Sequence, residues 1–338
     1  MKRGILIMNL GSPDTTEVKD VKRYLNEFLM DERVIDKPWI VRALLVKGII
    51  VPFRAKRSAE AYKKIWIEAG SPLVVISRQL RDALKKEMED SVVIAMRYGN
   101  PSPRQAFDEL VQNNPDLEEV ILVPLYPHYA MSSFETAAEY AKKQYKKGKY
   151  KFQLSVIKPF YNREEYINAL SESIKDYLQQ EYDHILFSYH GIPERHILKS
   201  DVTGSHCLKS ENCCEVLSPA HQYCYRHQCR ETTRLVTEKL GIPKDNWSIS
   251  FQSRLGRDEW LKPYTDFLLN EFPSKGIKKL LILSPAFVSD CLETLEEIGM
   301  EGKEHFLHAG GESFVQIPCM NVRPAWVKAL KEIVNGQS

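Results

Sequence analysis

Two pairs of matching segments recur in the two halves of this 338-residue chain. The run GILIMNLGSP ends at Pro13 and the run HILFSYHGIP ends at Pro193, and each is an apolar strand closed by Gly-x-Pro. Further along, PHYAMSSFET (127–136) matches PAFVSDCLET (285–294) in the same order. Self-similarity at matched positions indicates repeated architecture. The sequence therefore predicts two duplicated domains.

Short apolar runs rich in β-branched residues alternate with longer amphipathic stretches. This alternation is typical of parallel strands joined by helical crossovers, so we predict an α/β fold with a parallel four-stranded sheet in each half. The predicted domains are 1–160 and 161–338, and the second ends in a helix. The eight predicted strands are 4–9, 92–97, 120–125, 152–157, 185–189, 248–252, 280–284 and 314–318.

Charge and hydropathy exclude several classes of protein. The 47 Lys and Arg nearly balance the 45 Asp and Glu, which argues against a general nucleic-acid binder. A hydrophobic fraction of 43% fits a globular protein with a full core and excludes disordered and collagenous chains. The apolar run at the N-terminus is short and is interrupted by Asn9, so we expect a first strand and a cytoplasmic protein.

The two copies differ at one position where a titratable side chain could take part in catalysis. His190 in the second copy stands where the first has Leu10, whereas Glu293 is matched by Glu135. Ligands of open parallel sheets bind beyond the carboxyl ends of the strands, so we expect His190 and Glu293 at one rim. A histidine there is a natural general base or metal ligand, although a lone histidine is more often structural. The prediction that His190 is a functional residue therefore depends on its expected proximity to Glu293.

Carboxylates recur every four residues at Glu293, Glu297 and Glu301. On a helix this spacing places the three on one face, where like charges repel. Most charge runs are solvated faces. This one follows an apolar strand at the expected rim, so it also fits a row of oxygen ligands that passes a divalent ion inward.

Five of the seven cysteines fall in one segment, about 200–229, which suggests a local metal site in a reducing compartment. Four thiolates suffice for zinc or for an iron–sulfur cluster, and the spacing does not decide between them. Three histidines in the segment, His206, His221 and His227, leave mixed ligation open. The cysteines are Cys207, Cys213, Cys214, Cys224 and Cys229.

The segment PWIVRALLVKGIIVPFRAKR (about 38–57), here called the lip, combines large apolar side chains with five cations and no acidic residue. Arg42 and Lys47 interrupt it too early for a membrane span. It fits either a core helix with solvated cations or an apolar surface that rests on a membrane or grips a flat apolar ligand.

With these residues in place, the chain resembles the ferrochelatases, which insert ferrous iron into a porphyrin in the last step of protoheme synthesis. The combination of SYHGIP with a later SDCLETLEEI is specific to that family. The NLGSPD motif and the sequence as a whole resemble the protoporphyrin type of Gram-negative bacteria. The matching motifs are NLGSPD (9–14), AGSPL (69–73), RYGNP (97–101), PLYPHY (124–129), SYHGIPERH (188–196), FQSRLGRDEWLKPYT (251–265), SDCLETLEEI (289–298) and HAGGESFVQIPCMN (308–321).

The resemblance implies two Rossmann-like domains of the chelatase class II fold, with a porphyrin cleft between them. It implies that His190 and Glu293 are the catalytic pair and that, with Glu297 and Glu301, they bind the substrate iron. It also implies a membrane-facing entrance at the lip, with peripheral contact on the inner face of the membrane. The residues expected to line the porphyrin cleft are Leu10, Arg97 and Tyr98.

By resemblance to family members with an internal insertion, a [2Fe–2S] cluster is preferred to zinc in the cysteine segment. Its expected ligands are the first four cysteines, with Cys229 as a competitor. Cys291 stands where several relatives have a histidine. Three alternatives remain: a chelatase for another metal or tetrapyrrole, a non-catalytic porphyrin or haem carrier, and a redox sensor built on the cysteines.

Overall fold

The protein forms two parallel four-stranded sheets, as the sequence predicts. The structure is a computed structural model that describes residues 2–254, 256 and 258–336. Two positions of the FQSRLGRDEWLKPYT motif, 255 and 257, lie outside the described residues. All eight predicted strands are confirmed: β1 Arg3–Gly11, β2 Ser91–Tyr98, β3 Glu119–Pro124, β4 Gln153–Val156, β5 His184–His190, β6 Trp247–Gln252, β7 Lys279–Leu283 and β8 Ser313–Gln316.

The order of the strands confirms the duplication. The first sheet runs β2-β1-β3-β4 and the second runs β6-β5-β7-β8, with every pair parallel. The likeness extends to single hydrogen bonds: the Met96 N–H donates to the Pro101 carbonyl, and the Phe251 N–H donates to the Pro263 carbonyl. The two central strands, β1 and β5, therefore end at equivalent places.

Helices connect and cover the strands. Three segments have π-helical hydrogen bonding, a form found mostly at functional sites: η1 Leu44–Ile50, η2 Met131–Glu135 and η7 Glu293–Gly302. The 3₁₀ turns are η3 Asp176–Gln179, η4 Pro219–Gln222, η5 Lys244–Asn246 and η6 Phe272–Lys275. The α-helices are α1 Val18–Leu29, α2 Trp39–Ala43, α3 Val51–Ile65, α4 Pro72–Glu87, α5 Pro103–Asn113, α6 Thr136–Gly148, α7 Glu164–Lys175, α8 Glu194–Ser200, α9 Tyr225–Leu240, α10 Thr265–Glu271, α11 Lys303–His308 and α12 Pro324–Asn335.

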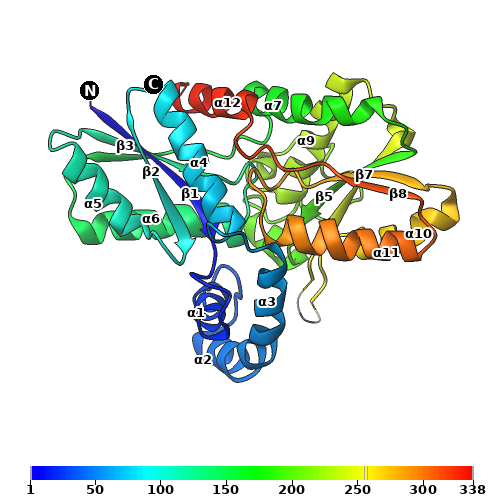
Figure 1. Ribbon diagram of the computed structural model, residues 1–338, viewed down its shortest axis with the longest axis horizontal. Coiled ribbons are helices and arrows are strands. Elements are labelled where there is room, and N and C mark those ends of the chain that lie inside the picture. The colour runs from blue at the N-terminus through cyan, green and yellow to red at the C-terminus, as the bar shows by residue number, and fades with distance from the viewer. Residues whose placement is uncertain (1, 255, 257, 337–338) are drawn as a thin grey trace.

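The two halves lie side by side, and α1, α2 and α3 form a separate lobe below them (Figure 1). This lobe contains the lip, which the structure builds as α2, η1 and the start of α3. Along the opposite edge, α12 packs against α7 and also contacts α4 of the first half. No helix in the described ranges is both long enough and apolar enough to span a bilayer.

One apolar cluster runs through both halves. Ile5 and Ile7 of β1, Ile185 and Phe187 of β5, and Trp326 of α12 all belong to it, and each is almost completely buried. Strands covered on both faces are apolar along their whole length, which explains the unbroken runs in the sequence. Full burial of a large apolar side chain contributes about 1.5–3 kcal/mol, so this shared core holds the sheets together. The boundary at 160 and 161 stays a prediction.

Candidate active site

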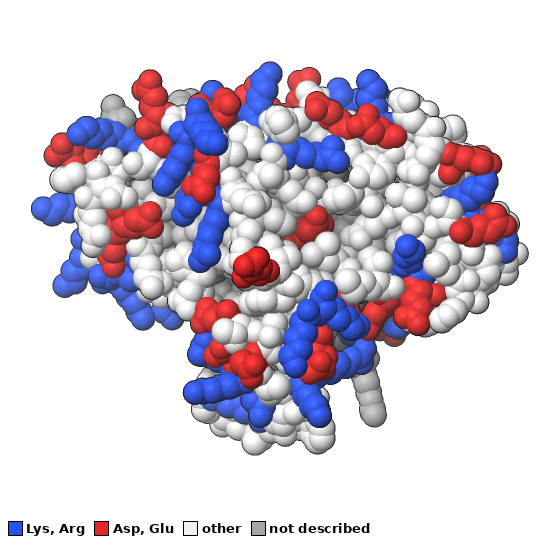
Figure 2. All heavy atoms as spheres, viewed as in Figure 1, with Lys and Arg blue, Asp and Glu red and all other residues white. Residues whose placement is uncertain are grey.

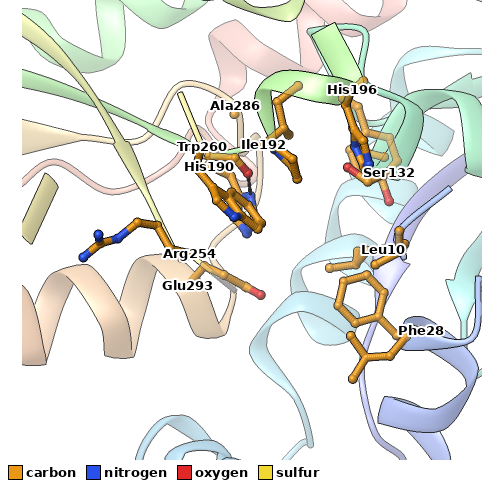
Figure 3. A pocket seen from close by; sticks show the side chains of 18 of the residues that line it. Leu10, Phe28, Ser132, His190, Ile192, His196, Arg254, Trp260, Ala286 and Glu293 are labelled. Atoms are coloured by element: carbon orange, nitrogen blue, oxygen red, sulfur yellow. Dashed lines mark hydrogen bonds between the residues drawn. The ribbon is translucent and has the colours of Figure 1, made fainter. Parts of the chain in front are cut away.

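A cleft of about 370 Å³ lies between the two halves, at the carboxyl ends of β1 and β5. His190 from β5 and Glu293 from η7 lie on one wall, and Leu10 and Phe28 face them across the open space (Figure 3). The structure therefore brings together His190 and Glu293, which are far apart in the sequence. The wall opposite them is apolar, which suits a flat ring.

His190 is held by the backbone of the turn that follows it. Its Nδ1 lies 2.7 Å from the Gly191 carbonyl oxygen. Because a carbonyl only accepts, Nδ1 carries the hydrogen and Nε2 keeps its lone pair. Burial lowers the pKa of His190, although the Glu293 carboxylate opposes the shift. The imidazole is thus a neutral base at pH 7.

Gly191 is required by close approach of the backbone. A Cβ at this position would lie 2.8 Å from the Gln252 carbonyl oxygen, which accepts the Gly191 N–H. Any larger residue would push β6 away from β5. The glycine in the SYHGIP motif therefore secures the position of His190.

Two of the three expected carboxylates reach the cleft. Glu293 and Glu297 line it from η7, whereas Glu301 is not among the lining residues. The Glu301 side chain is 39% exposed, and its Oε1 lies 3.7 Å from Arg57 Nη2. Burial, together with the neighbouring charge of Glu293, raises the pKa of Glu297 to about 7. Glu297 can therefore exchange protons near neutrality.

Arg97 and Tyr98 differ from the prediction that they line the cleft. Both are absent from its lining and are turned toward Asp31, which lies 66 residues earlier than Arg97. Arg97 pairs with the Asp31 carboxylate, and the Tyr98 hydroxyl donates to it at 2.9 Å. Burial favours the neutral acid, but Arg97 and Thr136 outweigh it and hold the pKa of Asp31 below its usual value. Arg97, Tyr98 and Asp31 therefore form a bonded group outside the lining of the cleft.

Several residues that sequence reasoning missed line the cleft, among them Phe28, His128, Tyr225 and Trp260. His128 lies in the PLYPHY motif and Trp260 in the FQSRLGRDEWLKPYT motif, so the motifs were a usable signal for both. Burial lowers the pKa of His128 to about 3, and its Nε2 lies 2.9 Å from Thr232 Oγ1. His128 is therefore a neutral structural group at pH 7.

Among the described residues, four cations border the cleft: Lys37, Arg54, Arg195 and Arg254. Arg195 pairs with Asp36 at 2.7 Å and with Asp258 at 2.5 Å, and Arg254 pairs with Asp266 at 2.7 Å. Within the described ranges, Lys37 and Arg54 form no ion pair. In the part of the chain that the structure describes, these two cleft cations are available to an anionic group on a ligand.

The cysteine segment contains buried thiols in mutual contact. Cys207, Cys213, Cys214, Cys224 and Cys229 are all buried and free of disulfide bonds. The Cys224 thiol lies close enough to those of Cys207 and Cys214 to influence their pKa values, and Arg226 Nη1 lies 3.6 Å from Cys213 Sγ. Burial raises the pKa of Cys207 to about 11. In the part of the chain that the structure describes, no group of three His, Cys, Asp or Glu side chains is placed to hold a metal ion.

The three histidines of the segment bind backbone carbonyls. His206 Nε2 and His221 Nε2 lie 2.6 Å and 3.0 Å from the Cys213 carbonyl oxygen. His227 Nδ1 lies 2.8 Å from the Cys214 carbonyl oxygen. Their ring nitrogens therefore support the loop that carries the two adjacent cysteines.

Some side chains of the lip line the cleft, and others are exposed to solvent. Leu45 and Ile50 line the cleft, whereas Phe53 is 81% exposed and Trp39 is 64% exposed. The tip of this lobe shows an uncharged surface with Lys and Arg side chains above it (Figure 2). One of the five cations differs from expectation, because Arg42 is buried and donates to the Lys37 carbonyl at 2.9 Å.

The paired sheets with a cleft between them define the class II chelatase fold. A SirB structure from Bacillus subtilis with Fe³⁺ matches with a TM-score of 0.52 at 14% identity, covering 100% of this chain and 97% of that one. A cobalt complex of the sirohydrochlorin chelatase SirB from Bacillus subtilis subspecies spizizenii matches with a TM-score of 0.54 at 12% identity, covering 99% of this chain and 97% of that one. At such low identity these likenesses show the fold alone.

The chain belongs to the ferrochelatase family, whose model matches residues 2–338. A ferrochelatase from Pseudomonas fluorescens (strain Pf0-1) is 51% identical over 328 residues, which are 96% of this chain and 95% of the relative. One from Ectopseudomonas mendocina (strain ymp) is 50% identical over 329 residues, which are 97% of this chain and 96% of the relative.

Proposed function

We propose that this protein is a ferrochelatase that inserts ferrous iron into protoporphyrin to give protohaem in haem synthesis. The observation that carries the proposal is the neutral imidazole of His190 beside Glu293 and Glu297 in one apolar cleft. Membership of the ferrochelatase family supports the same activity. The reaction exchanges two pyrrole protons for one divalent ion, so a site must accept protons and stabilise positive charge.

His190 supplies the first proton acceptor in this mechanism. Its Nε2 lone pair accepts a pyrrole proton, while Nδ1–H stays bonded to the Gly191 carbonyl. The imidazolium that forms is stabilised by the Glu293 carboxylate. Glu297, whose pKa is about 7, accepts the second proton and returns it to solvent on the side of Glu301. The iron enters as the two protons leave, so the metal-free ring and the metallated ring carry the same net charge.

The cleft also prepares the ring for metal. In this mechanism the porphyrin occupies the space that separates Leu10 and Phe28 on one wall from His190 on the other, the two walls seen in Figure 3. Binding energy from these apolar walls bends the ring and turns a nitrogen lone pair out of its plane, toward the geometry of the transition state. Lys37 and Arg54 are available to the carboxylates of the porphyrin.

Anaerobic incubation with ferrous iron and protoporphyrin tests the activity, because insertion changes the visible absorbance of the ring. Conversion that competes successfully against cobalt and nickel is expected. Preferred insertion of another metal would reassign the protein to a different chelatase. Tight porphyrin binding without conversion would identify a carrier and contradict the proposal.

We also propose that the cysteine segment holds a [2Fe–2S] cluster on Cys207, Cys213, Cys214 and Cys224, with zinc as the alternative. The number and kind of donors support this, since the segment contains four buried thiols without disulfide bonds. As they are placed among the described residues, these thiols do not form a group of three donors around one point. Cys229 packs instead among Tyr166, Tyr189 and Tyr225 in the core. When bound, the cluster would supply one-electron chemistry or a covalent link between the loop and α9.

The visible spectrum of the protein as purified tests the cluster. We expect Cys224→Ser to lose the charge-transfer bands and Cys229→Ser to keep them. Stoichiometric zinc without visible bands would replace the cluster by zinc. Retention of the bands in Cys224→Ser would contradict the ligand set.

Peripheral membrane contact through the lip, on the cytoplasmic face, is the remaining part of the proposal. The exposed side chains of Trp39, Leu44 and Phe53 support it, together with the cations around them. Flotation with vesicles that contain anionic lipid should decrease in the double variant Trp39→Ser/Phe53→Ser. The matched control is Val111→Ser, an exposed apolar residue on α5. Equal flotation of both variants would contradict the contact.

A further inference from the structure

The hydroxyl of Tyr225 donates a hydrogen bond to the main-chain carbonyl of His190, at 2.9 Å. Tyr225 is buried, lines the cleft, and is the first residue of α9. This bond therefore joins the start of α9 to the last residue of β5.

This bond acts on the peptide that orients the imidazole. The peptide between His190 and Gly191 is held at both ends, because the Gly191 N–H donates to the Gln252 carbonyl at 2.7 Å. The next carbonyl, that of Gly191, accepts the hydrogen of His190 Nδ1 at 2.7 Å. Rotation of this peptide would turn the Gly191 carbonyl away from the ring. The tautomer that leaves Nε2 free would then lose its support.

We propose that Tyr225 is a positioning residue for His190, and that it connects the cysteine segment to the metal-insertion site. The inference deepens the proposed chelatase activity and rests on it. Tyr225 directly follows Cys224, the N-cap residue of α9. One turn later, the Gln228 side chain accepts the Tyr129 N–H at 2.6 Å and donates to the Gln222 carbonyl at 2.9 Å. A shift of the cysteine segment thus moves the phenol that holds His190.

Tyr225→Phe removes one oxygen atom and tests the role. The matched control is Tyr189→Phe, because Tyr189 is equally buried in the same core, and its hydroxyl bonds Thr233 Oγ1 at 2.8 Å instead. With protoporphyrin and zinc or ferrous iron, we expect Tyr225→Phe to lower kcat about tenfold, the effect of one lost hydrogen bond, with KM for porphyrin within about twofold. Tyr189→Phe should keep the wild-type kcat. Both are compared at a temperature at which their circular dichroism equals that of the wild type.

The ring nitrogens of His190 give a second measurement that does not require turnover. Long-range ¹H–¹⁵N spectra of histidine-labelled protein should show hydrogen on Nδ1 in the wild type and in Tyr189→Phe. In Tyr225→Phe the signal should move toward a mixture of tautomers. An unchanged tautomer and an unchanged kcat would overturn the proposal. A wild type that inserts no metal would refute the chelatase function, while the tautomer comparison would still decide the role of Tyr225.

Discussion

The two halves of the molecule share one sheet order but use their equivalent side chains differently. In the first half, Glu135 accepts from Arg33 Nε at 2.9 Å and also binds the Tyr129 hydroxyl. In the second half, Glu293 lies in the cleft, and among the described residues no Lys or Arg pairs with it. Leu10, one residue before the end of β1, is the counterpart of His190 at the end of β5.

The different environments of Glu135 and Glu293 show how equivalent positions of a duplicated fold can take a structural role in one copy and a chemical role in the other. A carboxylate with a permanent cationic partner has its charge committed to that pair. A carboxylate beside a neutral imidazole can respond to a passing proton or metal ion. We therefore propose that the half with paired groups shapes the wall of the cleft and that the half with unpaired groups performs the reaction.

Replacing His190 should have the largest effect. We expect His190→Ala to lower kcat for metal insertion by about 10³-fold, the scale of a lost general base, while porphyrin still binds. Leu10→Ala, at the equivalent position, should act mainly on KM because it removes apolar contact. Fluorescence titration measures binding and the absorbance assay measures turnover. Near-normal turnover by His190→Ala would remove the distinction between the halves.

Substitution of the two equivalent glutamates should affect different properties, catalytic activity for Glu293 and stability for Glu135. Glu293→Gln should lower kcat about 100-fold with little change in the free energy of unfolding. Glu135→Gln should instead cost about 1–2 kcal/mol of stability through its weakened bond to Arg33, with kcat largely kept. Urea unfolding and steady-state kinetics measure the two effects. The comparison fails if both variants lose the same property.

The pH dependence of stability should show a smaller effect at Glu297. Because its folded pKa, about 7, lies above that of an unfolded glutamate, its stabilising contribution is complete below about pH 4 and is lost as pH rises through 7. Relative to wild type, Glu297→Gln should therefore gain about 2 kcal/mol between pH 5 and pH 8. Glu301→Gln, half-exposed on the same helix, is the control. Parallel pH profiles for both variants would contradict the shift.

Periodic and repeated features could be predicted from the sequence, and long-range pairing could not. The strands followed from unbroken apolar runs, and the common cleft of His190 and Glu293 followed from the rule that sites lie at strand ends. Arg97 also lies near the end of a strand, but the direction of its side chain depends on Asp31 in a distant loop, and no local pattern reveals that partner. Tyr225 was missed for a similar reason, because its role depends on one bond to a backbone atom.

The apolar cluster shared by both sheets has a consequence for how the protein unfolds. Each half has a smaller apolar cluster of its own, but the larger cluster is shared: Trp326 of α12 packs against Phe160 and Tyr166, and α12 also contacts α4. The ancestral units have thus become a single cooperative entity that should melt in one calorimetric transition. Because the two copies share an apolar cluster, the stability of each copy depends on the other.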